Sequence, residues 1–278
     1  MINLIKNIIK NILGIASIPL TKLFKRNPSI SVLIFHHVDK KDFASFKKLM
    51  IRLDKEVGFI NPSDLDSLYS NSLKITSKKL LLTFDDGFLS NYYLAKEILD
   101  LLNIKALFFV IPNFANIVDR KKQINFMKDN ILVNESELNN NEMSPMSYDN
   151  LRELIINGHS IGSHSMNHYN ISKIKSNEDL NHEIIESKLT LEKELNINID
   201  HFAFPFGDSK SISNIGIELA NQNYKYIYSG IRGINKLNNK NKIQWRESLH
   251  LENNIFYNLF VSFNGISFKD KNIRNKIK

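Results

Sequence analysis

The stretch LLLTFDDGF, residues 80–88, is an apolar run that ends in two adjacent acids, Asp85 and Asp86, and a glycine. The run is typical of a buried strand. Asp and Gly also form surface turns, and Gly87 can supply a positive φ, so a plain turn is the simplest alternative. Two carboxylates about 4 Å apart repel by about 4 kcal/mol at an effective dielectric of about 20. If the pair is buried at a strand end, it therefore needs a cation or a proton beside it.

Apolar runs of this kind alternate with amphipathic patterns along the chain. The expected strands are residues 31–38, 79–84, 105–112, 159–165, 201–207 and 224–230. The expected helices are residues 43–57, 88–103, 148–157, 177–195 and about 213–222. Repeated alternation predicts an α/β fold with a parallel sheet, and at this length a barrel is the economical closure. Functional side chains are then expected at the carboxyl ends of the strands.

The domain organisation follows from composition. With 278 residues and 42% hydrophobic content, the chain can bury one large core. That core domain is expected over residues 31–262, between a basic leader, residues 1–30, and a basic tail, residues 263–278. The periodicity fades over residues 113–146, which are rich in Asn and Lys, and this stretch is expected to be an insertion or a long loop.

Charge and cysteine content restrict the partners. The chain has no cysteine, which excludes disulfides and thiolate metal sites, so any metal must be held by His, Asp or Glu. The net charge is +8, but much of it lies at the two ends, whereas the middle carries mixed charge. This distribution does not predict nucleic acid as a partner.

The leader mixes apolar residues with Lys6 and Lys10, and its apolar run, residues 12–20, is too short to span a bilayer. It has no convincing cleavage site for a signal peptide. An amphipathic segment lying on an anionic membrane is favoured. The expected location is therefore the cell envelope, either membrane-associated or exported, on a side of the membrane that the sequence leaves open.

The stretch SHSMNH, residues 163–168, places His164 and His168 four residues apart. On a helical turn this spacing puts both imidazoles on one side, where they suit a metal ion. A divalent ion on both histidines and one of the two acids would balance the carboxylates and leave the other acid to handle a proton of an attacking water. A set of two histidines and one carboxylate is typical of a hydrolase or of an oxygen-activating enzyme.

A hydrolase also needs a proton donor for its leaving group, and an imidazole is the usual choice. The stretch LIFHHV offers His36 and His37 at the end of the first strand. Because side chains alternate along a strand, at most one of them should point into the site. A structural or surface role is the simpler reading of either histidine alone.

Three stretches together, TFDDG, HSMNH and FAFPFG, resemble the first three motifs of the polysaccharide deacetylases, the NodB-homology group also called carbohydrate esterase family four. The resemblance runs from Ser31 to Leu249. It implies a distorted, incomplete (β/α) barrel that binds one divalent metal ion, zinc first and cobalt or nickel as alternatives. The ligands that it implies are Asp86, His164 and His168.

The resemblance also implies the roles of the remaining groups. Asp85 would be the general base that takes a proton from the attacking water. The backbone N–H of Phe206, between Pro205 and Gly207, would stabilise the oxyanion that develops on the substrate carbonyl.

The chain departs from the family pattern in two places. Many members have an Arg two residues before the proline of FAFPFG, where this chain has Ala203. Arg246 in QWRESLH is a candidate substitute, although a surface arginine is the simpler reading. The late Leu-x-x-x-His strand that usually supplies the general acid is not evident, and His250 in SLHLE is one candidate for that acid.

The branch that acts on poly-N-acetylglucosamine instead places the acid before the DDG motif, in a sequence like Tyr-His-x-Val. The stretch FHHV resembles it, which makes His36 the preferred acid and His37 its outward neighbour.

Aromatic residues near the late strands have two readings. Trp245, with Tyr224, Tyr226 and Tyr228, would form a wall on which a sugar stacks, or would pack in the core. His159 is expected to be structural.

The expected function is a metal-dependent hydrolase that removes N-acetyl groups from an amino sugar of a bacterial surface polysaccharide or its lipid-linked precursor. Its partner would be that N-acetylated glycan. One alternative is a deformylase of a polyprenyl-linked amino sugar, which would release formate in place of acetate. Another is a catalytically inactive glycan-binding protein that has kept the barrel and lost activity, which the presence of Asp85 and all three implied ligands makes the weaker reading.

Overall fold

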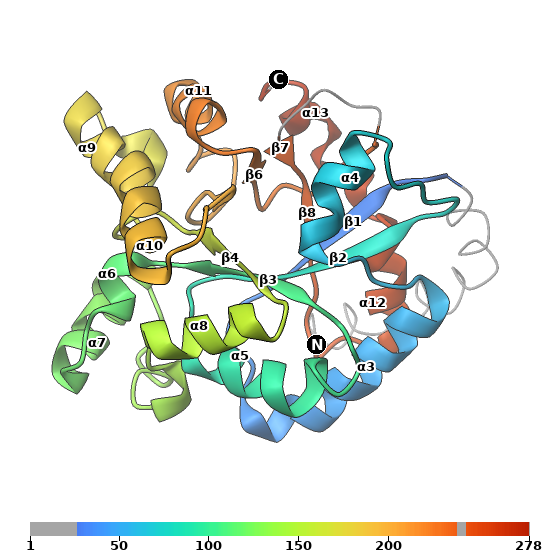
Figure 1. Ribbon diagram of the computed structural model, residues 1–278, viewed down its shortest axis with the longest axis horizontal. Helices are drawn as coiled ribbons and strands as arrows, with labels where there is room; N and C mark the ends of the chain where they lie inside the picture. The colour runs from blue at the N-terminus through green and yellow to red at the C-terminus, as the bar shows by residue number, and fades with distance from the viewer. Residues whose placement is uncertain (1–26, 238–242, 278) are drawn as a thin grey trace, which may run out of the picture.

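The computed structural model describes residues 27–237 and 243–277. Its centre is a parallel sheet with the strand order β7-β6-β5-β4-β3-β2-β1-β8 (Figure 1). The strands are β1 (Ile30–Phe35), β2 (Lys79–Phe84), β3 (Ala106–Val110), β4 (Ser160–Ser163), β5 (His201–Ala203), β6 (Tyr226–Tyr228), β7 (Ile243–Gln244) and β8 (Arg246–Ser248). The first six strands lie where the sequence predicts them, whereas β7 and β8 were not predicted.

The sheet curls into a barrel with one open seam. The two edge strands are successive pieces of the chain, because β7 pairs with β6, β8 pairs with β1, and only Trp245 separates them. No ladder joins β7 to β8 within the described residues. The expectation of an incomplete (β/α) barrel is therefore confirmed.

Alternation along the strands divides the apolar side chains into two layers. Val32 of β1, Leu81 of β2 and Phe109 of β3 belong to a cluster inside the barrel. Their neighbours, such as Leu33 and Leu82, belong to the larger cluster that packs against the helices. Since side chains point to opposite faces in turn, a residue's parity decides whether it faces the barrel interior.

The helices surround this barrel (Figure 1). They are α3 (Phe43–Glu56), α4 (Leu65–Tyr69), α5 (Leu89–Leu94), α6 (Pro112–Ala115), α7 (Arg120–Phe126), α8 (Tyr148–Ile156), α9 (Asn177–Asn181), α10 (Ser187–Leu195), α11 (Asn214–Asn223), α12 (Ile255–Ser262) and α13 (Lys271–Arg274). The two ends of α8 are set by a capping residue and a glycine, as the sequence predicts. Ser147 caps α8 by accepting a hydrogen bond from the Asn150 N–H, and Gly158 follows that helix with a φ of +85°.

The stretch 113–146 contains short helices as well as loops. It includes most of α6, all of α7 and a π turn at Met127–Ile131. Its apolar residues form a small cluster of their own with Phe88 and Ile111. This cluster fixes the stretch against the end of the barrel where β2 and β3 finish.

The structure describes the two ends of the chain to different extents. Most of the predicted leader, residues 1–30, lies outside the described residues, which begin at residue 27, and Ile30 already belongs to β1. The basic tail is described up to Ile277, and Arg274 donates a hydrogen bond to the Ser267 carbonyl (2.8 Å). None of the helices in the described part of the chain has the length and apolar character needed to cross a bilayer.

Candidate active site

The two adjacent acids separate because the backbone turns sharply between them. The Asp85 N–H donates to the Phe35 carbonyl (3.0 Å), so Asp85 continues the ladder of β2 and faces the barrel interior, as Thr83 does. Asp86 has a φ of +70° and Gly87 a φ of +75°, both in the left-handed region. Asp85 and Asp86 are only 2% and 4% exposed. A plain surface turn is therefore excluded.

The histidine pair lies on a tight turn after β4, and the helical turn that the spacing suggested is not formed. His164 still follows the strand, since its N–H donates to the Val110 carbonyl (2.9 Å). Ser165 and His168 then have φ values of +61° and +62°, and the His168 N–H donates to Ser165 Oγ (3.0 Å). Such left-handed residues cost energy and concentrate at functional sites.

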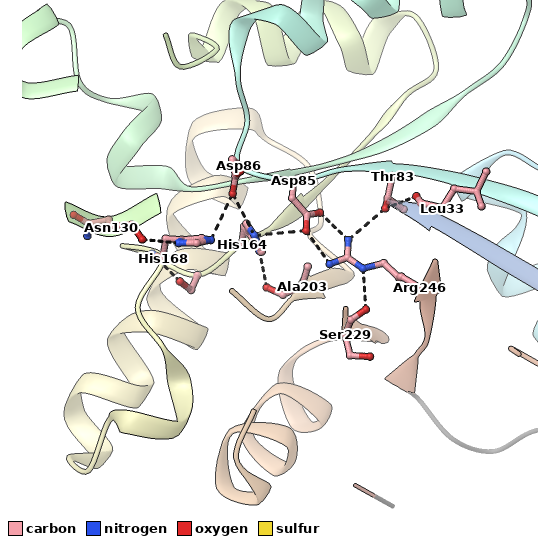
Figure 2. A network of polar contacts seen from close by, with 11 residues as sticks. Leu33, Thr83, Asp85, Asp86, Asn130, His164, His168, Ala203, Ser229 and Arg246 are labelled. Carbon is pink, nitrogen blue, oxygen red and sulfur yellow. Dashed lines mark hydrogen bonds and ion pairs between the residues drawn. The ribbon is translucent and has the colours of Figure 1, made fainter. Parts of the chain in front are cut away.

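These turns bring three donor atoms together. Nε2 of His164 and Nε2 of His168 each lie 3.5 Å from Oδ1 of Asp86 (Figure 2). The three groups lie within 4.8 Å of one another and are buried. The structure thus brings together the ligands that the family resemblance implies.

The hydrogen bonds of the two histidine rings determine which ring nitrogen carries the proton and which one keeps a free lone pair. Nδ1 of His164 donates to the Ala203 carbonyl and Nδ1 of His168 to the Asn130 carbonyl, each at 2.9 Å. Because a carbonyl only accepts, each neutral ring keeps its proton on Nδ1 and turns an Nε2 lone pair towards Asp86. Burial lowers the pKa of His164 to about 4, against the opposing pull of Asp85. This imidazole is therefore neutral at pH 7.

The donor set fits a divalent ion. Lone pairs that face a carboxylate oxygen repel it unless a cation lies between them. Donors about 2.1 Å from a tetrahedral zinc ion are about 3.4 Å apart, close to the observed 3.5 Å. Asp86, His164 and His168 are therefore suited to hold such an ion.

Arg246 balances the charge of Asp85. Its Nη1 and Nη2 donate to Oδ1 and Oδ2 of Asp85 at 2.7 and 2.8 Å, and its Nε donates to the Ser229 carbonyl at 3.0 Å (Figure 2). Burial alone would raise the pKa of Asp85, but the Arg246 guanidinium, with His164, lowers it to about 2. Asp85 is therefore a carboxylate at neutral pH.

One expectation is corrected by this ion pair. Arg246 is 1% exposed, so the surface position is wrong for it. It is the first residue of β8, and its side chain points into the barrel. Its guanidinium contacts both oxygens of Asp85 and so helps to keep this acid ionised, beside any charge that a bound metal ion would supply.

The two candidate acids line one cavity of about 360 Å³ beside the ends of β1 and β8. His36 is exposed, has the parity of the interior residues Val32 and Ile34, and its charge helps to lower the pKa of Asp85. His250 lies across the cavity, with its Nε2 3.4 Å from Ser248 Oγ. Both imidazoles therefore line the same cavity, although Asp85 and the three donor residues do not line it, and His36 is the one that acts on the pKa of Asp85.

His37 faces the helices and does not point outward into solvent. Its Nδ1 lies 2.8 Å from Ser90 Oγ and its Nε2 2.9 Å from Oδ1 of Asp39. Since it is half-buried and held at both nitrogens, it anchors the segment that carries His36.

The stretch 205–207 closes the site on the side of His168. The Phe206 ring lies 4.7 Å from the His168 ring, centre to centre, and Phe206 has a φ of +61°. None of the hydrogen bonds between described residues uses the Phe206 N–H. Gly207 is required at its position, because a Cβ there would lie 2.4 Å from the Gly230 nitrogen.

The aromatic residues near the late strands belong mainly to the core. Trp245 is 4% exposed and packs in the large cluster, so it does not offer a face to a sugar. Tyr224 and Tyr228 are also buried, whereas the half-buried Tyr226 stacks on His201. His159 is structural, as expected: its Nδ1 accepts from the Ala106 N–H (3.0 Å).

Several supporting groups had no signal in the sequence. Asn130 acts through its backbone carbonyl, as do Ala203 and Ser229, and any residue type can do so. Thr83 could have been found from parity, since it lies two residues before Asp85 on the same face. Its hydroxyl accepts from Nη1 of Arg246 at 3.3 Å.

Comparisons with known proteins agree with this geometry. The family model described as polysaccharide deacetylase matches residues 73–226, which include both acids, both histidines and the stretch 205–207. His36 and Arg246 lie outside the matched range. No curated protein matched the sequence.

Solved structures share the fold at low sequence identity. The Streptococcus pyogenes deacetylase PplD in complex with acetate is 22% identical, with a TM-score of 0.61, over 81% of this chain and 93% of that one. IcaB from Ammonifex degensii is 17% identical, with a TM-score of 0.62, over 86% and 99%. The BpsB deacetylase domain from Bordetella bronchiseptica is 14% identical, with a TM-score of 0.62, over 80% and 96%.

The family model covers more than half of the chain and contains the residues that the fold gathers at the barrel mouth. The chain therefore belongs to the polysaccharide deacetylase family and is a carbohydrate N-deacetylase.

Proposed function

We propose that this protein removes N-acetyl groups from an amino sugar of a bacterial surface polysaccharide or of its lipid-linked precursor, with a divalent ion, zinc first, held by Asp86, His164 and His168. The observation that carries the proposal is the convergence of two Nε2 lone pairs on Asp86 beside an independently ionised Asp85. An ion held there would supply Lewis-acid chemistry and a lowered pKa for water.

Asp85 is proposed as the general base. Arg246 donates to both of its oxygens, and Oδ2 also lies 3.7 Å from Nε2 of His164, beside the donor set. The carboxylate therefore has a fixed orientation towards the place where a water would attack the amide carbonyl. As the water adds, Asp85 takes its proton.

The leaving amine needs a proton, and His36 is proposed to donate it from the cavity beside β1. The Phe206 N–H is proposed to stabilise the negative charge that develops on the substrate oxygen. A catalytically inactive glycan binder is less well supported, since Asp85 and the three donor residues are all present and gathered in one place.

Acetate release across a panel of N-acetylated glycans, with and without a chelator, tests this function. We expect acetate from at least one amino-sugar polymer or lipid-linked sugar, loss of activity with the chelator and recovery with added Zn²⁺. Formate from a formylated sugar, with no acetate from any glycan, would show a deformylase. Full activity after metal removal would exclude the metal site.

We also propose contact with an anionic membrane in the cell envelope. The support is the positive charge of the two ends of the chain. Sedimentation with anionic vesicles tests it: binding should weaken as salt is raised, and should be absent with neutral vesicles.

A further inference from the structure

The turn that carries the histidine pair is held from outside by a buried acid. Glu183 lies in the π turn His182–Glu186, between α9 and α10, and is 1% exposed. Its Oε2 accepts from the Asn167 N–H (3.0 Å) and its Oε1 from Asn167 Nδ2 (2.7 Å). Its backbone carbonyl accepts from the Met166 N–H (3.1 Å). Two successive residues between the histidines are thus fixed to Glu183.

Asn167 also forms hydrogen bonds with two residues of the stretch 113–146. Its Oδ1 accepts from Asn113 Nδ2 (2.7 Å), and its carbonyl accepts from Asn130 Nδ2 (2.8 Å). The Asn130 carbonyl in turn accepts from Nδ1 of His168 (2.9 Å). A continuous path of hydrogen bonds therefore leads from the Glu183 carboxylate to the ring whose Nε2 faces Asp86.

The burial of the Glu183 carboxylate in this turn needs a physical reason. No Lys or Arg of the described residues forms an ion pair with Glu183. Burying a carboxylate is expensive, and here it is compensated by hydrogen bonds to a turn that contains two left-handed residues, Ser165 and His168. π turns of this kind are frequent at functional sites.

We propose that Glu183 is a positioning residue: by fixing Asn167 it preassembles His164 and His168 for the metal ion. The inference rests on the proposed function, because it assumes that these histidines bind a divalent ion. Partners outside the ligand shell commonly change metal affinity about 10- to 100-fold when they are altered.

The test is the Zn²⁺ affinity of the full-length protein, measured by competition with a chromophoric chelator. Glu183→Gln keeps the shape but turns an amide NH₂ towards one of the two Asn167 donors. We expect its Zn²⁺ dissociation constant to rise about 10- to 100-fold. Glu186→Gln is the matched control, because Glu186 lies on the same turn but its side chain is 58% exposed. We expect it to bind Zn²⁺ within about twofold of wild type.

A charge-conserving exchange separates positioning from general stability. In Glu183→Gln/Asn167→Asp, the Gln amide can donate to the new carboxylate while its oxygen accepts the backbone N–H of residue 167. We expect this double variant to recover Zn²⁺ affinity to within about threefold of wild type, even if the single variant does not fold.

The outcomes are distinct. Unchanged Zn²⁺ affinity in a folded Glu183→Gln protein overturns the inference alone. A folded double variant that binds as weakly as the single variant, or no better than 10-fold below wild type, also overturns it. Wild-type protein that binds no Zn²⁺ overturns the proposed function together with this inference.

Discussion

Arg246 and Asp85 are 161 residues apart in the chain, yet they form a two-pronged ion pair inside the barrel, with N–O distances of 2.7 and 2.8 Å. The pair joins β8, the edge strand on one side of the seam, to the carboxyl end of β2. The contact that orients the proposed base therefore also ties this edge strand to the middle of the sheet.

Removing the arginine should destabilise the protein. Arg246→Met leaves the Asp85 carboxylate buried without its partner, and breaking a buried pair in this way costs about 3 to 5 kcal/mol. We expect the free energy of unfolding, measured with urea, to fall by that amount. Arg152→Met is the control, since Arg152 is exposed and its ion pair with Asp149 is worth less than about 1 kcal/mol. Equal losses in the two variants would contradict the structural role of the buried pair.

Asp85→Asn should abolish most turnover and spare metal binding. The amide cannot accept the proton of the attacking water, and loss of a general base costs about 10²- to 10⁴-fold in kcat. Because the substitution also leaves Arg246 unpaired, Asp85→Asn/Arg246→Met serves as a control that should regain stability but not activity. The measurements are acetate release and Zn²⁺ affinity. Wild-type turnover in the folded single variant would exclude Asp85 as the base.

The two histidines of the shared cavity should differ in their effects. His36→Ala removes the proposed proton donor and should lower kcat about 10²- to 10⁴-fold. His250→Ala leaves that donor in place and should change kcat by less than about threefold. A substrate with a good leaving group should reduce the His36 effect, because its departure needs less protonation. A larger loss of kcat in His250→Ala than in His36→Ala would assign the general acid to His250.

Glu247 should contribute a loss of stability as pH rises, opposite in sign to the contribution of His164, whose pKa burial lowers to about 4. Burial raises the pKa of this acid from 4.5 to about 7. Between these values the folded protein keeps a proton that the unfolded chain releases, so stability is lost as pH rises towards and past 7. Glu247→Gln cannot ionise and should lose this dependence, which is worth on the order of 3 kcal/mol.

Urea unfolding at pH 5 and pH 8 measures the effect of that substitution. The exposed acid Glu252 provides the control, and Glu252→Gln should keep the wild-type dependence. If the free energy of unfolding of Glu247→Gln and of wild type changed by the same amount between the two pH values, Glu247 would not make this contribution.

The sequence by itself determined the features that depend on neighbouring residues. The alternation of apolar runs identified six of the strands, Ser147 and Gly158 marked the ends of α8, and the motifs identified Asp85, Asp86, His164 and His168. These features are local, because a strand's period, a cap or a motif is complete within a few residues.

The tertiary structure alone decided what depends on distant parts of the chain. The strands β7 and β8 are two and three residues long, too short for a readable period, and only their pairing with β6 and β1 forms them. That pairing brings Arg246 to Asp85. The spacing of His164 and His168 suggested a helix, whereas contacts with Glu183 and Asn130 hold them on a left-handed turn. Such contacts form only when the chain is folded, because they join residues that no local pattern connects.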